Sequence, residues 1–290
     1  MIRHSGTVRG LFLFWFLLGP VFLPALEGQD TPRRWERRGE PTRPPLSLFH
    51  ATQAINLPTA ETLSRGEWQF EIAHRFFPPV SDGQEAFWGM DGPAFMRLGL
   101  GYAFSDGGMV TLARSNFLDN WDLQVKVRVL EFGDGPIPVK AAIQGGAAWS
   151  TSVGDRDASD SGNFQYYGQM VVNTLLGDRV ALGVVPSYLY NVLLDAEDTV
   201  QDLYWGFYGQ LYLTEMVSLL GEWNVGENRG ELEHDAGAFG LELETGGHFF
   251  KIFLTNSVRL NPSQYLAGSS YPFEPEEWRV GFSITRLLRF

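Results

Sequence analysis

The segment Trp121–Val129, WDLQVKVRV, alternates apolar and polar side chains without a break. Its odd-numbered positions hold one tryptophan, one leucine and three valines, and its even-numbered positions hold Asp, Gln, Lys and Arg. Because successive side chains of a β-strand point to opposite faces, this pattern predicts a strand with one apolar and one polar face.

The same alternation recurs from residue 67 to the end of the chain. Twelve segments of roughly ten residues follow one another, and turn residues separate them. Three examples are EWQFEIAHRFF (67–77), LYWGFYGQLYL (203–213) and WRVGFSITRLLRF (278–290). The 33 glycines and the 14% of aromatic residues fit short strands and tight turns better than helices. The sequence therefore predicts an all-β fold.

Two features favour a membrane barrel over a soluble sandwich. Short connections, such as SDGG and ETGG, alternate with long ones, and only the connection near Asn120 is short where a long one is due. Aromatic residues also gather at the ends of the apolar faces, as they do at membrane interfaces. A sheet in lipid must close on itself to pair its edge amides. We therefore expect a transmembrane, antiparallel, up-and-down β-barrel of 12 strands in the bacterial outer membrane.

The chain before the barrel divides into three predicted segments. Residues 1–28 combine two early arginines with a short apolar stretch broken by Gly19 and Pro20, which is typical of a secretory signal peptide. Residues 29–45 are rich in Arg and Pro and predict a linker. Residues 46–66 are too polar and irregular for a membrane strand, so we expect a plug or a periplasmic segment. The barrel is predicted over residues 67–290.

A motif at the start of the barrel resembles a known family. The stretch FHATQAINLPTAETLSRGEWQFEIAHRF (49–76) is similar to the opening motif of the membrane-bound β-barrel family called domain of unknown function 5777. The matching residues are Phe49, Thr52, Ile55, Asn56, Glu61, Thr62, Leu63, Gly66, His74, Arg75 and Phe76. The resemblance implies a barrel in the outer membrane and no established activity.

The polar face of the predicted strands supplies the residues expected to line the lumen. Both charge signs occur among them, and they are Glu71, Arg75, Arg97, Lys126, Arg128, Lys140, Gln144, Gln169, Tyr208, Glu222, Glu242 and Arg279. Inward glycines such as Gly183 and Gly206 are expected to leave room for another backbone. We assign the plug residues as Thr52, Asn56, Glu61 and Thr62, with a helical turn over TAETL capped by Thr59.

The last segment is interpreted as the closing strand of the barrel. Its final residue, Phe290, is expected to anchor the strand at the inner interface and to complete a signal for the barrel-assembly machinery. Outer-membrane lipid is the second expected partner. A protein partner could bind through the N-terminal arm or the acidic outer loops, such as GDRDASDSGN (154–163).

Composition and motifs narrow the function. A net charge of -12 argues against nucleic acid, and the absence of cysteine excludes a thiolate nucleophile or a Cys-bound metal. No nucleophile motif accompanies His74 on the apolar face, and the acidic loops lack calcium-ligand spacing. We therefore expect no enzyme, cofactor or metal site. Two hypotheses remain: a plugged barrel that anchors a periplasmic or surface partner, or a narrow porin-like channel for small polar solutes.

Overall fold

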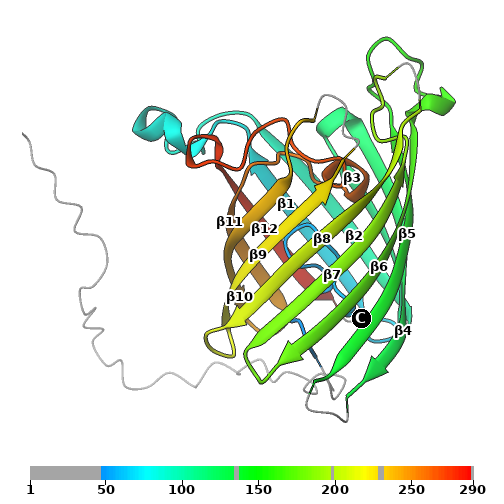
Figure 1. The fold of residues 1–290 in the computed structure, drawn as a ribbon, viewed down its shortest axis with the longest axis vertical. Helices are drawn as coiled ribbons and strands as arrows, with labels where there is room; N and C mark the ends of the chain where they lie inside the picture. The colour runs from blue at the N-terminus through cyan, green and yellow to red at the C-terminus, as the bar shows by residue number, and fades with distance from the viewer. Residues whose placement is uncertain (1–46, 134–136, 197–198, 228–231, 289–290) are drawn as a thin grey trace, which may run out of the picture. The chain divides into compact units, whose positions relative to one another are not determined.

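A closed barrel is formed by the chain in a computed structural model, which describes residues 47–133, 137–196, 199–227 and 232–288 (Figure 1). Each strand pairs antiparallel with its neighbours in sequence, and β1 pairs with β12 to close the ring. The predicted all-β fold with 12 antiparallel strands is thereby confirmed. The strands are β1 (Trp68–Phe76), β2 (Ala94–Ser105), β3 (Gly108–Ser115), β4 (Asn120–Phe132), β5 (Val139–Ser150), β6 (Phe164–Leu176), β7 (Val180–Tyr190), β8 (Gln201–Tyr212), β9 (Val217–Gly226), β10 (Ala236–Glu244), β11 (His248–Thr255) and β12 (Arg279–Leu288).

The connections differ in length at the two ends of the barrel. Tight turns join the strands at the end that we call the short-turn rim, and longer segments join them at the long-loop rim (Figure 1). The one short connection at the long-loop rim joins β3 to β4, as the sequence predicts. The helical turns at this rim are η1 (Val80–Ala86), η2 (Phe117–Asp119), η3 (Ser161–Asn163), η4 (Pro275–Glu277) and α1 (Pro262–Tyr265).

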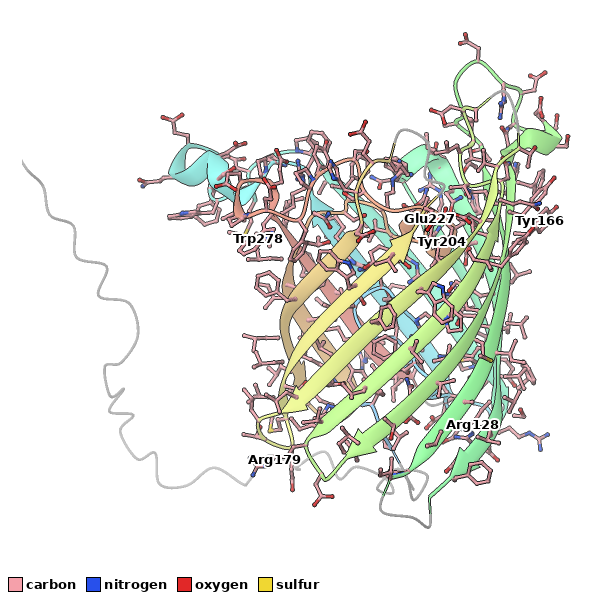
Figure 2. The ribbon with its side chains drawn as sticks, in the orientation of Figure 1. Arg128, Tyr166, Arg179, Tyr204, Glu227 and Trp278 are labelled. Atoms are coloured by element: carbon pink, nitrogen blue, oxygen red, sulfur yellow. The ribbon has the colours of Figure 1, made fainter. Side chains whose placement is uncertain are left out.

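The wall has an apolar outside and a polar inside. In β4, Leu123, Val125 and Val127 are 50%, 44% and 41% exposed, whereas the alternate residues Asp122 and Lys126 are buried. Figure 2 shows Arg128 and Arg179 at the short-turn rim, with Tyr166 and Trp278 toward the long-loop rim. The period of two in the sequence therefore separates a lipid-compatible surface from the lumen.

Several predicted segments lie outside the described residues. They are the signal peptide (1–28), the linker (29–45) and the end of the closing strand with Phe290. Their roles, including the assembly signal, stay predictions. Among the residues that the structure describes, no helix is long and apolar enough to cross a membrane.

Candidate functional site

The lumen contains a tight hairpin formed by residues 52–59. The amide of Ala54 donates to the carbonyl of Leu57 at 2.8 Å, and the amide of Thr59 donates to the carbonyl of Thr52 at 3.1 Å. An isolated β-bridge joins Gln53 to Pro58 between these two bonds. We call this element the lumen hairpin. It has a tip at residues 55–57 and a stem at residues 52 and 59.

A single carboxylate on the wall holds the tip. Glu222 of β9 accepts from the backbone amides of Ile55, Asn56 and Leu57 at 3.0, 2.8 and 3.3 Å. It also accepts from the side-chain amide of Asn56 at 2.5 Å. Consecutive backbone amides that converge on one anion form a nest, and charge-assisted hydrogen bonds are stronger than neutral ones. The tip is therefore fixed mainly through its main chain.

Two lysines hold the carbonyl groups of the hairpin. The ammonium of Lys126 in β4 donates to Thr52 O at 2.7 Å and to Thr59 O at 3.0 Å. Lys251 in β11 donates to the carbonyl groups of Gln53 and Ala54 and lies 3.4 Å from the carboxylate of Glu242. The wall thus presents cations to hairpin carbonyls and a carboxylate to hairpin amides.

The flanks of the hairpin are tied to the wall by a buried ion pair. Glu61 lies 2.7 Å from the ammonium of Lys140, and its other oxygen accepts from the amides of Leu48 and Phe49. The expected helical turn over TAETL is wrong, because residues 59–63 are not helical. Instead the Thr59 hydroxyl donates to the carbonyl of Ala51 at 2.6 Å and accepts from the amide of Glu61.

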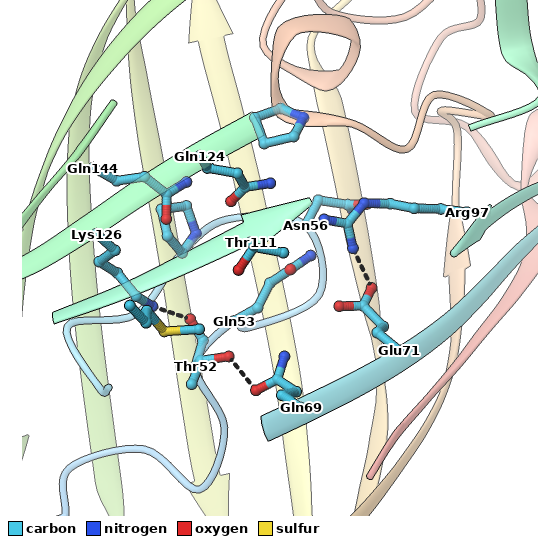
Figure 3. A pocket seen from close by; sticks show the side chains of 13 residues that line it. Thr52, Gln53, Asn56, Gln69, Glu71, Arg97, Thr111, Gln124, Lys126 and Gln144 are labelled. Carbon is cyan, nitrogen blue, oxygen red and sulfur yellow. Dashed lines mark hydrogen bonds and ion pairs between the residues drawn. The ribbon is translucent and has the colours of Figure 1, made fainter. Parts of the chain in front are cut away.

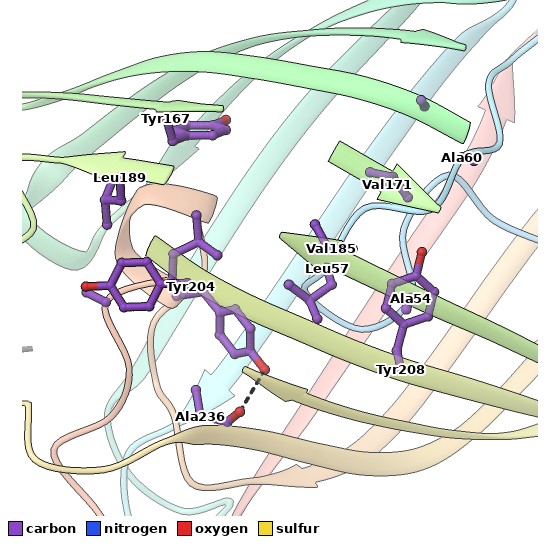
Figure 4. Packing of buried hydrophobic residues seen from close by; sticks show 14 of the residues in the cluster. Ala54, Leu57, Ala60, Tyr167, Val171, Val185, Leu189, Tyr204, Tyr208 and Ala236 are labelled. Atoms are coloured by element: carbon purple, nitrogen blue, oxygen red, sulfur yellow. Dashed lines mark hydrogen bonds between the residues drawn. The ribbon is translucent and has the colours of Figure 1, made fainter. Parts of the chain in front are cut away.

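One side of the segment 47–66 packs on an apolar part of the wall. Leu57 belongs to a buried cluster with Val185, Tyr204 and Tyr208 (Figure 4). Phe49 is a member of the same cluster. The rings of Phe49 and Tyr208 meet edge to face at 5.2 Å. This contact lies against β6–β8 and removes apolar side chains from water.

The inward glycines are only partly as predicted. A Cβ atom on Gly206 would lie 2.7 Å from a methyl group of Leu57, so this glycine does admit the hairpin. A Cβ atom on Gly183 would instead lie 2.2 Å from the ring of Tyr208 on the adjacent strand. The expectation that the inward glycines accommodate another backbone is therefore wrong at Gly183, which accommodates an aromatic ring.

The opposite side of the hairpin faces polar residues and two small cavities. One cavity, of about 20 Å³, lies between the hairpin and wall residues that include Glu71, Arg97 and Lys126 (Figure 3). A second, of about 10 Å³, lies beside Glu71 and Lys251. The larger one has room for about one water molecule. The ion pair between Arg97 and Glu71, with 2.8 Å between their nitrogen and oxygen, borders this side.

A second segment enters the lumen from the long-loop rim, and the sequence did not predict it. Residues 256–269 follow β11 and are buried apart from Arg259. Asn261 caps α1, with its side chain and that of Gln264 forming a capping box. It also accepts from Arg97 Nε at 2.8 Å. The sequence NPSQ (261–264) carries a cap, a proline at the first helical position and a glutamine three residues later, which could have revealed the turn.

Most predicted site residues face the interior, and a few lie at the rims. Arg128 contacts Asp106 and Glu131 at the short-turn rim, and Thr62 also bonds Asp106 there. Arg279 stacks on Tyr271 near the long-loop rim, with 3.6 Å to the ring centroid. The other predicted lumen and plug residues are buried: Glu71, Arg75, Arg97, Lys126, Lys140, Gln144, Gln169, Tyr208, Glu222, Glu242, Thr52, Asn56 and Glu61.

The predicted site residues do not include Lys251 and Asn173, which hold the hairpin segment. Lys251 is a lone charge in the apolar run FFKIF, and a charge in such a strand must face inward, so the signal was present. Asn173 accepts from the amide of Ala60 at 2.7 Å and donates to the hydroxyl of Tyr208 at 2.6 Å. Nothing in its local sequence distinguishes Asn173 from other polar inward residues.

Comparisons with known proteins give a family and a fold. A sequence profile described as "Membrane bound beta barrel domain (DUF5777)" matches residues 49–288. The NanC porin is 10% identical, over 77% of this chain and 99% of its own, with a TM-score of 0.46. The KdgM porin is 7% identical over 77% and 99%, with a TM-score of 0.45. Omp33 of Acinetobacter baumannii is 9% identical over 78% and 98%, with a TM-score of 0.41.

These structural likenesses concern the fold alone. A search of curated proteins finds no significant match.

Proposed function

This chain belongs to the family of membrane bound beta barrel domains, and we propose that it is a bacterial outer-membrane channel for small polar solutes that its own lumen hairpin closes. The short-turn rim faces the periplasm in this proposal, as short turns do in such barrels. The observation that carries the proposal is the two-sided setting of the hairpin. Its apolar side packs on β6–β8, and its other side borders polar, water-sized cavities.

The polar side is the proposed solute path. Its wall residues include Gln69, Gln124 and Gln144 together with the ion pair of Glu71 and Arg97. Of these side chains, Gln69 bonds the hairpin, because its oxygen accepts from the hydroxyl of Thr52 at 2.9 Å. Water can replace this neutral partner at a net free energy of only about 0.5–1.5 kcal/mol. A hairpin displaced from this side would leave a hydrated lumen with charges of both signs, which favours polar solutes.

The alternative is a permanently plugged barrel that anchors a partner. The apolar packing of Phe49 and Leu57 favours a fixed hairpin. The arm expected to reach the partner, residues 29–45, lies outside the described residues, so docking stays a prediction. The two functions share a closed lumen and differ in whether the hairpin moves.

A reversible crosslink between the hairpin and the wall distinguishes them. The chain has no cysteine, so Leu57→Cys combined with Gly206→Cys introduces a single pair. The Cβ of residue 206 would lie 3.4 Å from the Leu57 Cγ position, where the new sulfur would sit, which is close enough for a disulfide. In planar bilayers, we expect single-channel openings of the wild type, silence of the oxidised pair and recovery on reduction.

The single variant Leu57→Cys is the matched control, and oxidant should leave its openings unchanged. A wild type that never conducts, together with a reduced pair that is equally silent, would reject the channel and favour the anchor.

A further inference from the structure

The wall recognises the lumen hairpin through its peptide backbone. Three backbone amides at the tip meet the carboxylate of Glu222, and two carbonyl groups at the stem meet the ammonium of Lys126. Only the side-chain amide of Asn56 adds to the contacts of Glu222 with the hairpin. Any short peptide carries the same backbone groups. The hairpin therefore marks the positions where the wall can bind the N–H and C=O groups of a peptide.

The two wall groups form an anionic and a cationic pole. Glu222 is on β9 and Lys126 is on β4, and both side chains are buried, 5% and 4% exposed. Both hydrogen bonds that the structure gives to Lys126 end on hairpin carbonyls. When the hairpin leaves, each pole therefore loses the partners that the hairpin backbone supplies. In the hydrated lumen each pole still favours a ligand group of opposite charge, because charge-assisted hydrogen bonds are stronger than neutral ones.

The spacing of the poles sets the length of such a ligand. Lys126 contacts the carbonyl of residue 52, and Glu222 contacts the amide of residue 55, which lies three residues further along the chain, in the turn that the bond from the Ala54 amide to the Leu57 carbonyl closes. Three residues span at most about 10 Å, so this length is the upper limit for the separation of the two contacted groups. An extended tripeptide spans roughly the same distance between its ammonium and its carboxylate.

We propose that the opened lumen binds zwitterionic peptides of two or three residues, with the ammonium at Glu222 and the carboxylate at Lys126. This inference names the substrate class of the proposed channel, and it rests on that function in requiring the hairpin to move. An ion with one charge contacts one pole and is repelled by the other. A zwitterion of matching length satisfies both poles at once.

Binding of four peptides of equal length tests the proposal. In the test variant of the full-length chain, eight alternating Gly and Ser residues replace residues 52–59. The replacement keeps the length of the chain, removes the side-chain contacts of Asn56 and Leu57, and puts a flexible segment in place of the hairpin. The probes are trialanine, acetyl-trialanine, trialanine amide and acetyl-trialanine amide, measured by isothermal titration in detergent. Because one charge-assisted contact corresponds to about tenfold or more in affinity, we expect trialanine to bind at least about tenfold more tightly than either singly charged probe.

Crossed substitutions assign the poles. Glu222→Gln in this background should remove the preference for a free ammonium and keep the preference for a free carboxylate. Lys126→Gln should do the opposite. Glu244→Gln is the control, because this carboxylate accepts from the amides of Gly246 and Gly247 in a turn at the short-turn rim. It should leave both preferences unchanged.

The outcomes separate this inference from the proposed function. The inference is overturned if the protein conducts but does not prefer trialanine. It is also overturned if the preference for trialanine persists in Glu222→Gln and Lys126→Gln. In both cases the channel function still stands. If Glu222→Gln and Lys126→Gln each remove a different preference but the barrel never conducts, the peptide-binding site is supported and the channel is rejected. If the Gly–Ser chain does not fold, uptake of the same four peptides into liposomes bearing the wild-type chain and the two point variants decides by the same crossed pattern.

Discussion

At the scale of single residues, the interior is shaped by pairs of a glycine and a ring. Gly183 lies under the ring of Tyr208, whose hydroxyl donates to the carbonyl of Pro58 at 2.8 Å and accepts from Asn173. The glycine thus positions a ring that contacts the hairpin. Removing a side chain at one position is what permits a large side chain at its neighbour, because interiors are close-packed.

Gly183→Ala should destabilise the barrel and displace Tyr208. The added methyl carbon would lie 2.2 Å from the ring, and overpacking of this kind costs about 1–3 kcal/mol. The measurement is thermal unfolding in detergent, followed by the loss of the heat-modifiable gel band. Gly168→Ala is the matched control on the adjacent strand, since a Cβ atom there meets nothing within 4 Å. Equal melting of both variants would contradict this account of Gly183.

At the scale of elements, two inserted segments meet in the lumen. The hairpin and the segment 256–269 share the cavity of about 20 Å³, which Asn56 and Pro262 both line. Each segment also bonds one arginine of the wall. Arg75 donates to Asn56 at 2.6 Å, and Arg97 donates to Asn261 at 2.8 Å. The two insertions therefore meet at one cavity and are each held by an arginine of the paired strands β1 and β2.

Asn261→Ala should loosen the segment 256–269 without opening the barrel wall. The substitution removes the cap of α1 and the contacts with Arg97 and Asn120, and loss of a cap alone costs about 0.5–2 kcal/mol. Hydrogen–deuterium exchange should become faster in residues 261–266 and stay slow in the strands. Asn116→Ala, at an exposed position of the same rim, serves as the control. Unchanged exchange in Asn261→Ala would show that the cap and these contacts do not hold the segment.

At the scale of the whole molecule, the wall and its contents have different physical requirements. Every strand has two hydrogen-bonded neighbours, so the ring leaves no open sheet edge in the described part of the chain. Its outward side chains include many large apolar residues that are about half exposed. A soluble protein does not present such a continuous apolar surface to water.

The purified protein should therefore require detergent or lipid. An unboiled sample should migrate faster on a denaturing gel than a boiled one, because a closed barrel resists detergent until it is heated. The Gly–Ser replacement of residues 52–59 should keep this difference, since the ring pairing does not involve the hairpin. Recovery of a monodisperse monomer in plain buffer would contradict the membrane barrel.

Sequence alone determined the wall. The alternation in WDLQVKVRV and its repeats yields the strand number, the face that each side chain occupies and the rim at which each connection lies, because a period of two is a local property. It also singled out residues 46–66, whose irregular polarity does not fit a membrane strand. Glu71, Arg97, Lys126 and Glu222 were assigned to the lumen on the same ground.

Only the tertiary structure decided what fills the lumen. An inward polar residue occupies the same place in the alternating sequence whether its side chain faces water, another strand or an inserted segment. Glu222 meets the amide of Asn56 across 166 positions of sequence, and no local signal encodes such a pair. For the same reason, the sequence did not predict that residues 256–269 enter the lumen. Which backbone groups a buried charge will contact depends on how the ring closes, and closure is a property of the whole chain.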